Sequence, residues 1–172
     1  AVLMANAPFM EASERWMAAP NPQDEADLLR LFRVLRDSYH YTDILLADMN
    51  GQARLSLSGY VGPLDSEVTL PLAEAARDKR PTFTDLHWSA GGRAIHMGVI
   101  APLYPRGNGA QPFGAVILQI AADEYLYPLL ETWPAPSCTA ESLLVRRDGD
   151  AALFLNNPRY APNAALAMRI PF

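Results

Sequence analysis

The chain has 172 residues, of which 50% are hydrophobic and 19% are charged, and its net charge is −5. This length and composition suit one domain with a sizeable core, or one and a half small modules, and argue against a disordered tail. The 14 Lys and Arg residues form no long basic run, and the single cysteine, Cys138, allows no internal disulfide. Composition therefore argues against a nucleic-acid-binding surface and excludes a disulfide scaffold.

Neither end of the sequence is typical of a complete protein. The chain begins without an initiator methionine or signal peptide and ends at Ile170-Pro171-Phe172, inside an apolar pattern. No stretch approaches the ~18 apolar residues of a membrane span. We expect both ends to be boundaries within a longer chain, which can carry spans of its own.

The first part of the chain predicts helices. Residues 10–18 have a weak apolar pattern, which Asn21-Pro22 interrupts. Residues 24–39 have a stronger one, with four apolar residues at i, i+4, i+7 and i+11: Leu28, Phe32, Leu35 and Tyr39. This face is predicted to pack on a sheet or on a partner subunit, as in a homodimer.

Five strands are predicted next, over residues 43–48, 52–58, 82–88, 94–104 and 111–121. Asn50-Gly51 predicts a two-residue hairpin turn in which both residues have positive φ. Residues 59–64 are predicted as loop, 72–79 as a short helix, and 122–133 as a helix that contains Pro128. This order predicts an α+β fold, a five-stranded antiparallel sheet flanked by helices, as in PAS-like and GAF-like sensor domains.

A second module is predicted after the proline-rich linker Pro134-Ala135-Pro136-Ser137. Strands at 142–147 and 151–156 flank Asp148-Gly149 and repeat the strand, Gly-containing turn and strand of residues 43–57. The tail, 164–172, has room for one more strand. The predicted organisation is a helical region at 1–40, a PAS-like module at 41–133, and a linker with the truncated start of a second module at 134–172.

Three segments resemble a known family. Ile100-Ala101-Pro102-Leu103, leading to the Phe113–Leu118 strand, resembles the central hairpin of Cache sensor domains. The runs at 127–134, Tyr-Pro-Leu-Leu-Glu-Thr-Trp-Pro, and at 140–150, with its Leu-Leu-Val-Arg-Arg-Asp-Gly-Asp, resemble one set of bacterial receptors. The resemblance covers about residues 23–172. It implies a Cache (PAS-like) extracytoplasmic sensor domain of a sensor histidine kinase or diguanylate cyclase. The Arg-Trp-Tyr-Asp signature of amino-acid-binding Cache domains has no match, so the resemblance implies no ligand class.

Candidate binding residues gather around the fourth predicted strand. Alternation places Ile95, Met97, Val99 and Ala101 on one side, which is predicted as core. His96, Gly98 and Ile100 lie on the other, predicted as the pocket side, where Gly98 leaves space. The further candidates are Asp85, His87 and Trp88 on the preceding strand, with Arg93 and Tyr60 at the rim. The alternative is that these side chains point to water or bond loop backbones.

Catalysis, metal binding and a cofactor are not predicted. The sequence has no Gly-x-Ser-x-Gly elbow and no phosphate-binding loop ending in Lys-Ser/Thr. His40, His87 and His96 are too scattered to predict a metal site. The sequence thus predicts a non-catalytic periplasmic module of a membrane-anchored receptor that binds a small molecule. A cytoplasmic GAF-type regulatory domain is the alternative, and a hydrolase is disfavoured.

Overall fold

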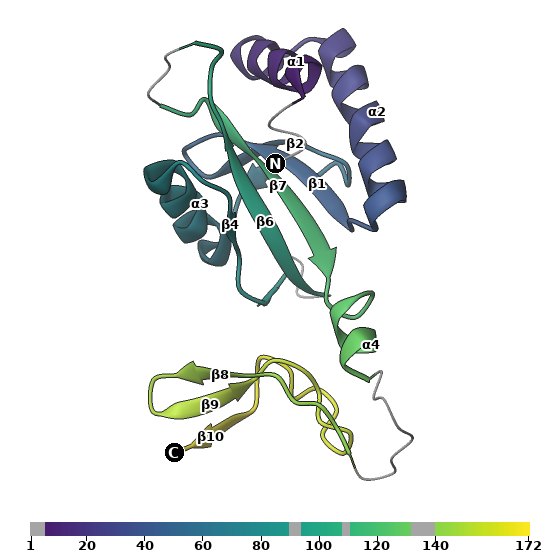
Figure 1. The fold of residues 1–172 in the computed structure, drawn as a ribbon, viewed down its shortest axis with the longest axis vertical. Helices are drawn as coiled ribbons and strands as arrows, with labels where there is room; N and C mark the ends of the chain where they lie inside the picture. The colour runs from purple at the N-terminus through teal and green to yellow at the C-terminus, as the bar shows by residue number, and fades with distance from the viewer. Residues whose placement is uncertain (1–5, 90–93, 108–110, 132–139) are drawn as a thin grey trace. The chain divides into compact units, whose positions relative to one another are not determined.

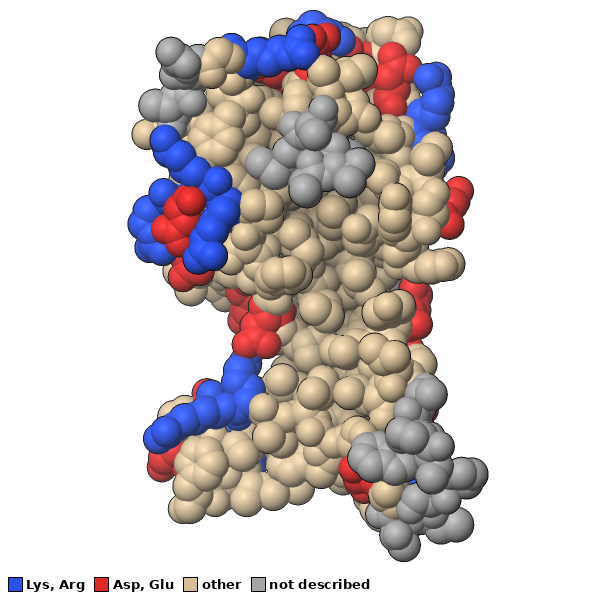
Figure 2. Space-filling view, in the orientation of Figure 1, with Lys and Arg blue, Asp and Glu red and all other residues tan. Residues whose placement is uncertain are grey.

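The computed structural model describes residues 6–89, 94–107, 111–131 and 140–172. They belong to two compact units, one made of residues 1–85 and 97–120, the other of residues 86–96 and 121–172. None of the helices in the described part of the chain is both long enough and apolar enough to serve as a membrane span. Both acidic and basic side chains appear on the face drawn in Figure 2, and in the first unit Arg77 and Arg80 both pair with Asp78.

Two helices open the first unit, α1 (Ala7–Ala18) and α2 (Pro22–Tyr39). Each begins after an asparagine cap: Asn6 accepts a hydrogen bond from Phe9 N, and Asn21 accepts one from Asp24 N. These caps satisfy backbone donors that a helix start leaves open, so both helices begin before the predicted residues 10 and 24. Arg15 of α1 donates two hydrogen bonds to Asp24 of α2, at 2.6 and 3.2 Å, and ties the two helices together.

A mostly antiparallel sheet follows, with the strand order β3-β2-β1-β7-β6-β4, and β5 pairs with β6. Its longer strands β1, β2, β6 and β7 are labelled in Figure 1. Its strands are β1 (Asp43–Ala47), β2 (Gln52–Ser56), β3 (Gly62–Pro63), β4 (Thr82–Phe83), β5 (His87–Trp88), β6 (Ile95–Leu103) and β7 (Gly114–Ala121). All five predicted strands are present, which confirms the predicted α+β, PAS-like class. The predicted strand at 82–88 is divided into β4 and β5, and β3 forms within the predicted loop.

The hairpin between β1 and β2 differs from the predicted two-residue turn. Gly51 has φ 76°, but Asn50 is not in the positive-φ region. Asp48 explains the difference, because its Oδ1 accepts hydrogen bonds from Asn50 N and Gln52 N and builds a longer turn. The pairing register also shifts between Leu46 and Ala47. The prediction of positive φ at both turn residues was wrong, because only Gly51 has it.

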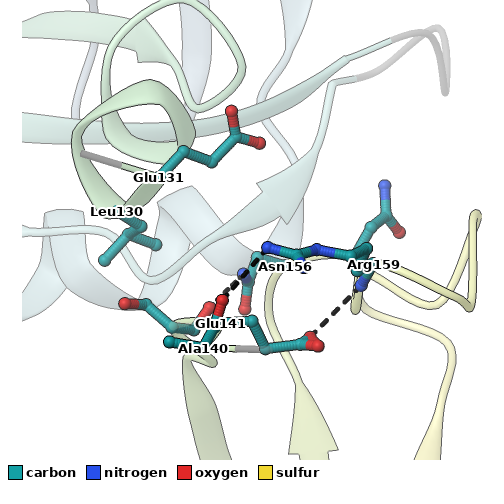
Figure 3. A pocket seen from close by; sticks show the side chains of 8 residues that line it. Leu130, Glu131, Ala140, Glu141, Asn156 and Arg159 are labelled. Carbon is teal, nitrogen blue, oxygen red and sulfur yellow. Dashed lines mark hydrogen bonds between the residues drawn. The ribbon is translucent and has the colours of Figure 1, made fainter. Parts of the chain in front are cut away.

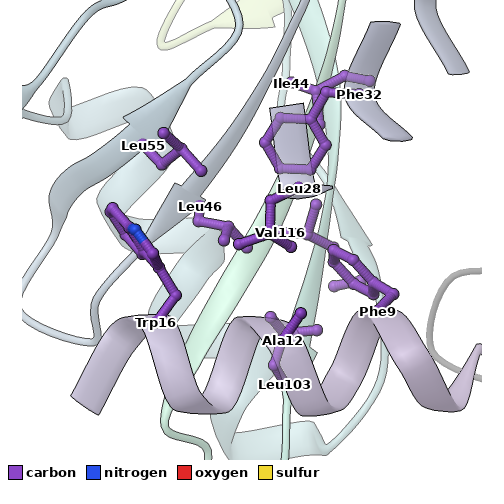
Figure 4. Close-up of a cluster of buried hydrophobic side chains, with 11 residues drawn as sticks. Phe9, Ala12, Trp16, Leu28, Phe32, Ile44, Leu46, Leu55, Leu103 and Val116 are labelled. Atoms are coloured by element: carbon purple, nitrogen blue, oxygen red, sulfur yellow. The ribbon is translucent and has the colours of Figure 1, made fainter. Parts of the chain in front are cut away.

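Helices cover the two faces of the sheet. On one face, Ile44, Leu46 and Val116 pack with Phe9, Ala12 and Trp16 of α1 and with Leu28 and Phe32 of α2 (Figure 4). On the other face, α3 (Ser66–Asp78) packs through Val68, Leu72 and Ala75. We call this second surface the α3 face; its buried strand residues are Leu45, Ala47, Ala53, Ile100, Ala115 and Ile117.

The second unit contains α4 (Leu126–Glu131) and a separate three-stranded antiparallel sheet, ordered β10-β9-β8. The strands are β8 (Val145–Asp148), β9 (Ala151–Phe154) and β10 (Arg169–Pro171). The prediction that the hairpin within 142–156 lies outside the first sheet is confirmed. The predicted boundaries of the three segments remain a prediction. Tyr127 of α4 donates a 2.6 Å hydrogen bond to Leu155 O, and burial raises the pKa of Tyr127.

Candidate functional site

The α3 face changes from apolar to polar along its strands. In the register of the sheet, Asp43 is the partner of Gln119 and precedes the buried Leu45 on the same face. Thr84 lies beside Gly98. Gly98 comes two residues before the buried Ile100 and therefore lies on the same face of β6. Together with Ser56, which pairs with Leu45, these side chains form a polar row across the α3 face: Ser56, Asp43, Gln119 and Thr84. No comparable row accompanies the opposite face, where Ile44 and Leu118 occupy the neighbouring positions in the described strands β1 and β7.

Asp43 is the charged member of the polar row and is only 8% exposed. Its Oδ1 accepts hydrogen bonds from Ile44 N at 2.8 Å and Ser58 N at 3.1 Å, and its Oδ2 accepts one from Ser58 Oγ at 2.5 Å. Ser58 Oγ is in turn 3.1 Å from Ser56 Oγ. These neutral donors hold the carboxylate in a fixed orientation at the start of β1, where burial would otherwise penalise its charge.

Thr84 and Gly98 form a reciprocal pair. Thr84 N donates to Gly98 O at 2.9 Å, and Gly98 N donates to Thr84 Oγ1 at 2.7 Å. The Thr84 hydroxyl thus accepts the bond from Gly98 N that a backbone carbonyl would accept in a regular ladder. The predicted strand at 82–88 is interrupted at this point, between β4 and β5. A Cβ added to Gly98 would lie 2.9 Å from Leu118 O and 3.7 Å from Gln119 Cγ. Glycine is present because β6 and β7 approach closely, so the expectation that Gly98 leaves pocket space was wrong.

The predicted pocket side of β6 is the α3 face, since Ile100 is fully buried in the cluster with α3. At the start of β6, within the second unit, His96 is the register partner of His87 of β5. His87 is 5% exposed and His96 is half-buried. The structure therefore brings together these two candidates, which the sequence places nine residues apart.

The remaining candidates lie in several environments. Asp85 is exposed, and Trp88 is 46% exposed on β5. Tyr60 donates its hydroxyl to Pro63 O at 2.5 Å, which closes the loop before β3. Arg93 lies outside the described residues. The described residues contain no group of three or more His, Cys, Asp or Glu side chains that could hold a metal ion.

Sequence reasoning missed Asp43, Thr84 and Gln119. Asp43 had a visible signal, since an acidic residue opens an otherwise apolar strand. Gln119 and Thr84 had none, because only the register of β1, β7 and β6 places them beside Asp43 and Gly98. All three offer hydrogen-bonding groups, and none is a nucleophile next to a base. The arrangement suits binding better than covalent catalysis.

Comparison with known proteins finds no matching family model and no matching curated protein. Solved structures do match. The ligand-binding domain of the Pseudomonas aeruginosa amino acid chemoreceptor PctB, solved with L-Arg, has a TM-score of 0.55 at 15% identity over 95% of this chain and 66% of that one. The sensor domain of the Vibrio cholerae histidine kinase DctB has a TM-score of 0.53 at 12% identity, over 70% of this chain and 45% of that one.

A third match is the domain of a sensory box/GGDEF family protein from Vibrio parahaemolyticus. Its TM-score is 0.53 at 16% identity, over 77% of this chain and 54% of that one. This chain therefore spans about half the length of two of these relatives. At such low identities the likeness is one of fold. It agrees with the Cache-like, PAS-like fold that the sequence resembles.

Proposed function

We propose that this chain is the ligand-sensing region of a membrane-bound signalling receptor and that a small extracellular molecule binds the α3 face at the polar row. The observation that carries the proposal is the difference between the two faces of the sheet. One face is filled by aromatic and aliphatic side chains of α1 and α2. The other combines aliphatic side chains and small alanines with the buried polar groups of Ser56, Asp43 and Thr84, and small-molecule sites are typically apolar with a few such polar groups.

Asp43 supports this placement through its charge. It is buried and forms no ion pair with any described residue. Its three hydrogen bonds come from neutral donors, which leaves part of the acceptor capacity of the carboxylate unused. Gln119 adds an amide in the next strand. A ligand that bonds both groups would be oriented by side chains that the sheet already holds in place.

The fold supports a receptor context for the chain. The structural relatives include sensor domains of kinases and chemoreceptors, some of them described as extracellular or ligand-binding. We place this chain in the periplasm, on a membrane-anchored parent with a histidine kinase or diguanylate cyclase output, and assign no catalysis to the module itself. Ligand binding would shift the populations of two receptor conformations. Membrane spans flanking the encoded module would support this placement, whereas an uninterrupted cytoplasmic chain would favour the GAF-type alternative.

The histidine pair is a second element of the proposal. His96 and His87 remain candidate ligand contacts, with Asp85, Trp88, Tyr60 and Arg93 as further candidates. The support for the first two is their register pairing and partial burial.

A thermal-shift screen against a metabolite library tests the proposal. A true ligand at 100 times its Kd stabilises the fold by about 2.7 kcal/mol, which raises Tm by roughly 5–10 °C for a chain of this size. Gln119→Leu should abolish the shift, and Gln52→Leu, the same change at an exposed position of β2, should keep it. The placement is wrong if Gln119→Leu keeps the full shift.

A further inference from the structure

A cavity of about 390 Å³ lies within the second unit, and none of the residues of the polar row lines it. It is lined by the end of α4, by the segment before β8 and by the segment after β9, through Leu130, Glu131, Ala140, Glu141, Ser142, Asn156, Asn157 and Arg159. Its volume falls in the ~300–1,000 Å³ range of small-molecule sites.

Asn156 explains why the cavity opens here. The β8–β9 ladder ends at the pair Val145 and Phe154, and Leu155 N adds one bond to Leu144 O. Beyond this point the side chain of Asn156, only 8% exposed, accepts from Leu144 N at 2.7 Å and donates to Ser142 O at 2.9 Å. The Asn156 side chain spans a greater distance than a direct hydrogen bond between two backbones. The segment before β8 and the segment after β9 therefore diverge here.

Further bonds fix the walls (Figure 3). Arg159 N donates to Glu141 Oε1 at 3.2 Å, and the Arg159 guanidinium donates to Ala140 O at 3.1 Å. Tyr127 holds α4 against the segment after β9 through Leu155 O, and Leu130 and Glu131 of the same helix line the cavity. The cavity is thus held by hydrogen bonds from all three of its walls.

The lining is complementary to an organic cation. The lining contains two carboxylates, those of Glu131 and Glu141, and one guanidinium, that of Arg159, so its net charge is −1 (two negative groups and one positive). The guanidinium is engaged at Ala140 O, and Glu141 uses only one of its two oxygens within the described chain. Leu130 supplies an apolar wall for an alkyl chain. We propose that this cavity is a second binding site, specific for a small organic cation with a protonated amine.

Three compounds of matched length test the charge preference: putrescine, the neutral butane-1,4-diol and the anionic succinate. Each is titrated into the ¹⁵N-labelled chain while amide chemical shifts are followed. Putrescine should shift the amides of Ser142, Asn157 and Glu141 saturably, and higher salt should weaken it. Butane-1,4-diol and succinate should leave these amides unchanged.

Charge-neutral variants assign the contacts. Glu131→Gln and Glu141→Gln should each raise the Kd for putrescine about two- to fivefold, as expected for partly exposed charge pairs. In Glu141→Gln the new side-chain amide oxygen can still accept the bond from Arg159 N, so the fold should survive, which a far-UV CD spectrum checks. Glu124→Gln, at an exposed position outside the cavity, should leave the Kd unchanged.

Several results would overturn the proposal: no saturable shift with putrescine, equal binding of the diol, tighter binding of succinate, or an equal loss of affinity in Glu124→Gln. None of these outcomes bears on the α3 face, so failure here leaves the proposed sensory function standing.

Discussion

Arg15 and Asp24 form a charged contact between α1 and α2 in the first unit. The hydrogen bond from the Arg15 guanidinium, followed by that from Asn21, lowers the pKa of Asp24. The pKa of Asp24 in the folded protein is then below its value in the unfolded chain. The ion pair therefore stabilises the fold above the unfolded-state pKa, and this contribution is lost as pH falls through the folded-state pKa.

Arg15→Gln tests this linkage by urea unfolding over a series of pH values. At neutral pH the variant should be less stable than the parent, and the difference should shrink and vanish in acid as Asp24 becomes protonated in both proteins. A difference that stays constant down to acid pH would show that Arg15 acts through packing and not through charge.

Gly98 makes a second prediction at the residue scale. Gly98→Ala should lower the free energy of unfolding by about 1–3 kcal/mol, because the added Cβ would lie 2.9 Å from the Leu118 carbonyl and the strands would have to separate. Chemical denaturation measures the change. A loss within about 0.5 kcal/mol would show that the β6–β7 contact relaxes freely.

These residues show where sequence reasoning reached its limit. The alternation in 94–104 correctly assigned Ile100 and Ala101 to opposite faces. It could not show that β7 lies too close to Gly98 for a side chain, because that distance depends on how two strands pack. The same limit hid Thr84, whose hydroxyl takes the place of a backbone acceptor.

At the scale of elements, the helical period of 24–39 predicted one buried face, and α2 confirms most of it. Leu28 and Phe32 are 1% and 0% exposed, whereas Tyr39 is 60% exposed. Tyr39 is the last residue of the helix, and its ring lies 6.1 Å from that of Tyr41 instead of on the sheet. The apolar period of a helix does not show where the sheet that it packs on ends.

Leu28→Ala should destabilise the protein by about 2–5 kcal/mol, because the removed atoms come from a filled core and leave a cavity. Val34→Ala on the same helix should change stability by less than about 0.5 kcal/mol, since Val34 is 56% exposed. Urea denaturation of both variants provides the comparison. Equal effects would mean that the buried face of α2 is assigned incorrectly.

In the second unit, Asn156→Ala should cost about 1–3 kcal/mol, because Leu144 N and Ser142 O lose their partners. Asn157→Ala is the neighbouring control; Asn157 is exposed and accepts one bond, from Ala165 N. Amide hydrogen exchange should show faster exchange at Leu144 in Asn156→Ala only. Unchanged protection there would contradict the bridging role of Asn156.

For the whole molecule, the order of elements was enough to predict the class of fold. The strand and turn signals at 43–57 and 142–156 also predicted that the two hairpins belong to different sheets, as they do. The polar row was not predictable, because Asp43, Thr84 and Gln119 come together only through the pairing of β1 with β7 and of β4 with β6, strands that are not consecutive in the sequence. The binding residues predicted from the sequence were chosen because they are close in the chain, and most of them therefore lie on or next to β5 and β6.

The most direct test of the sensory proposal is to map the contacts of the compound that gives the largest thermal shift, by amide and side-chain chemical shifts in the ¹⁵N-labelled chain. The proposal predicts saturable shifts at Asp43, Thr84, Gly98 and the Gln119 side-chain amide, together with residues of α3. Shifts confined to the face that packs on α1 and α2, or to residues 140–159, would contradict it.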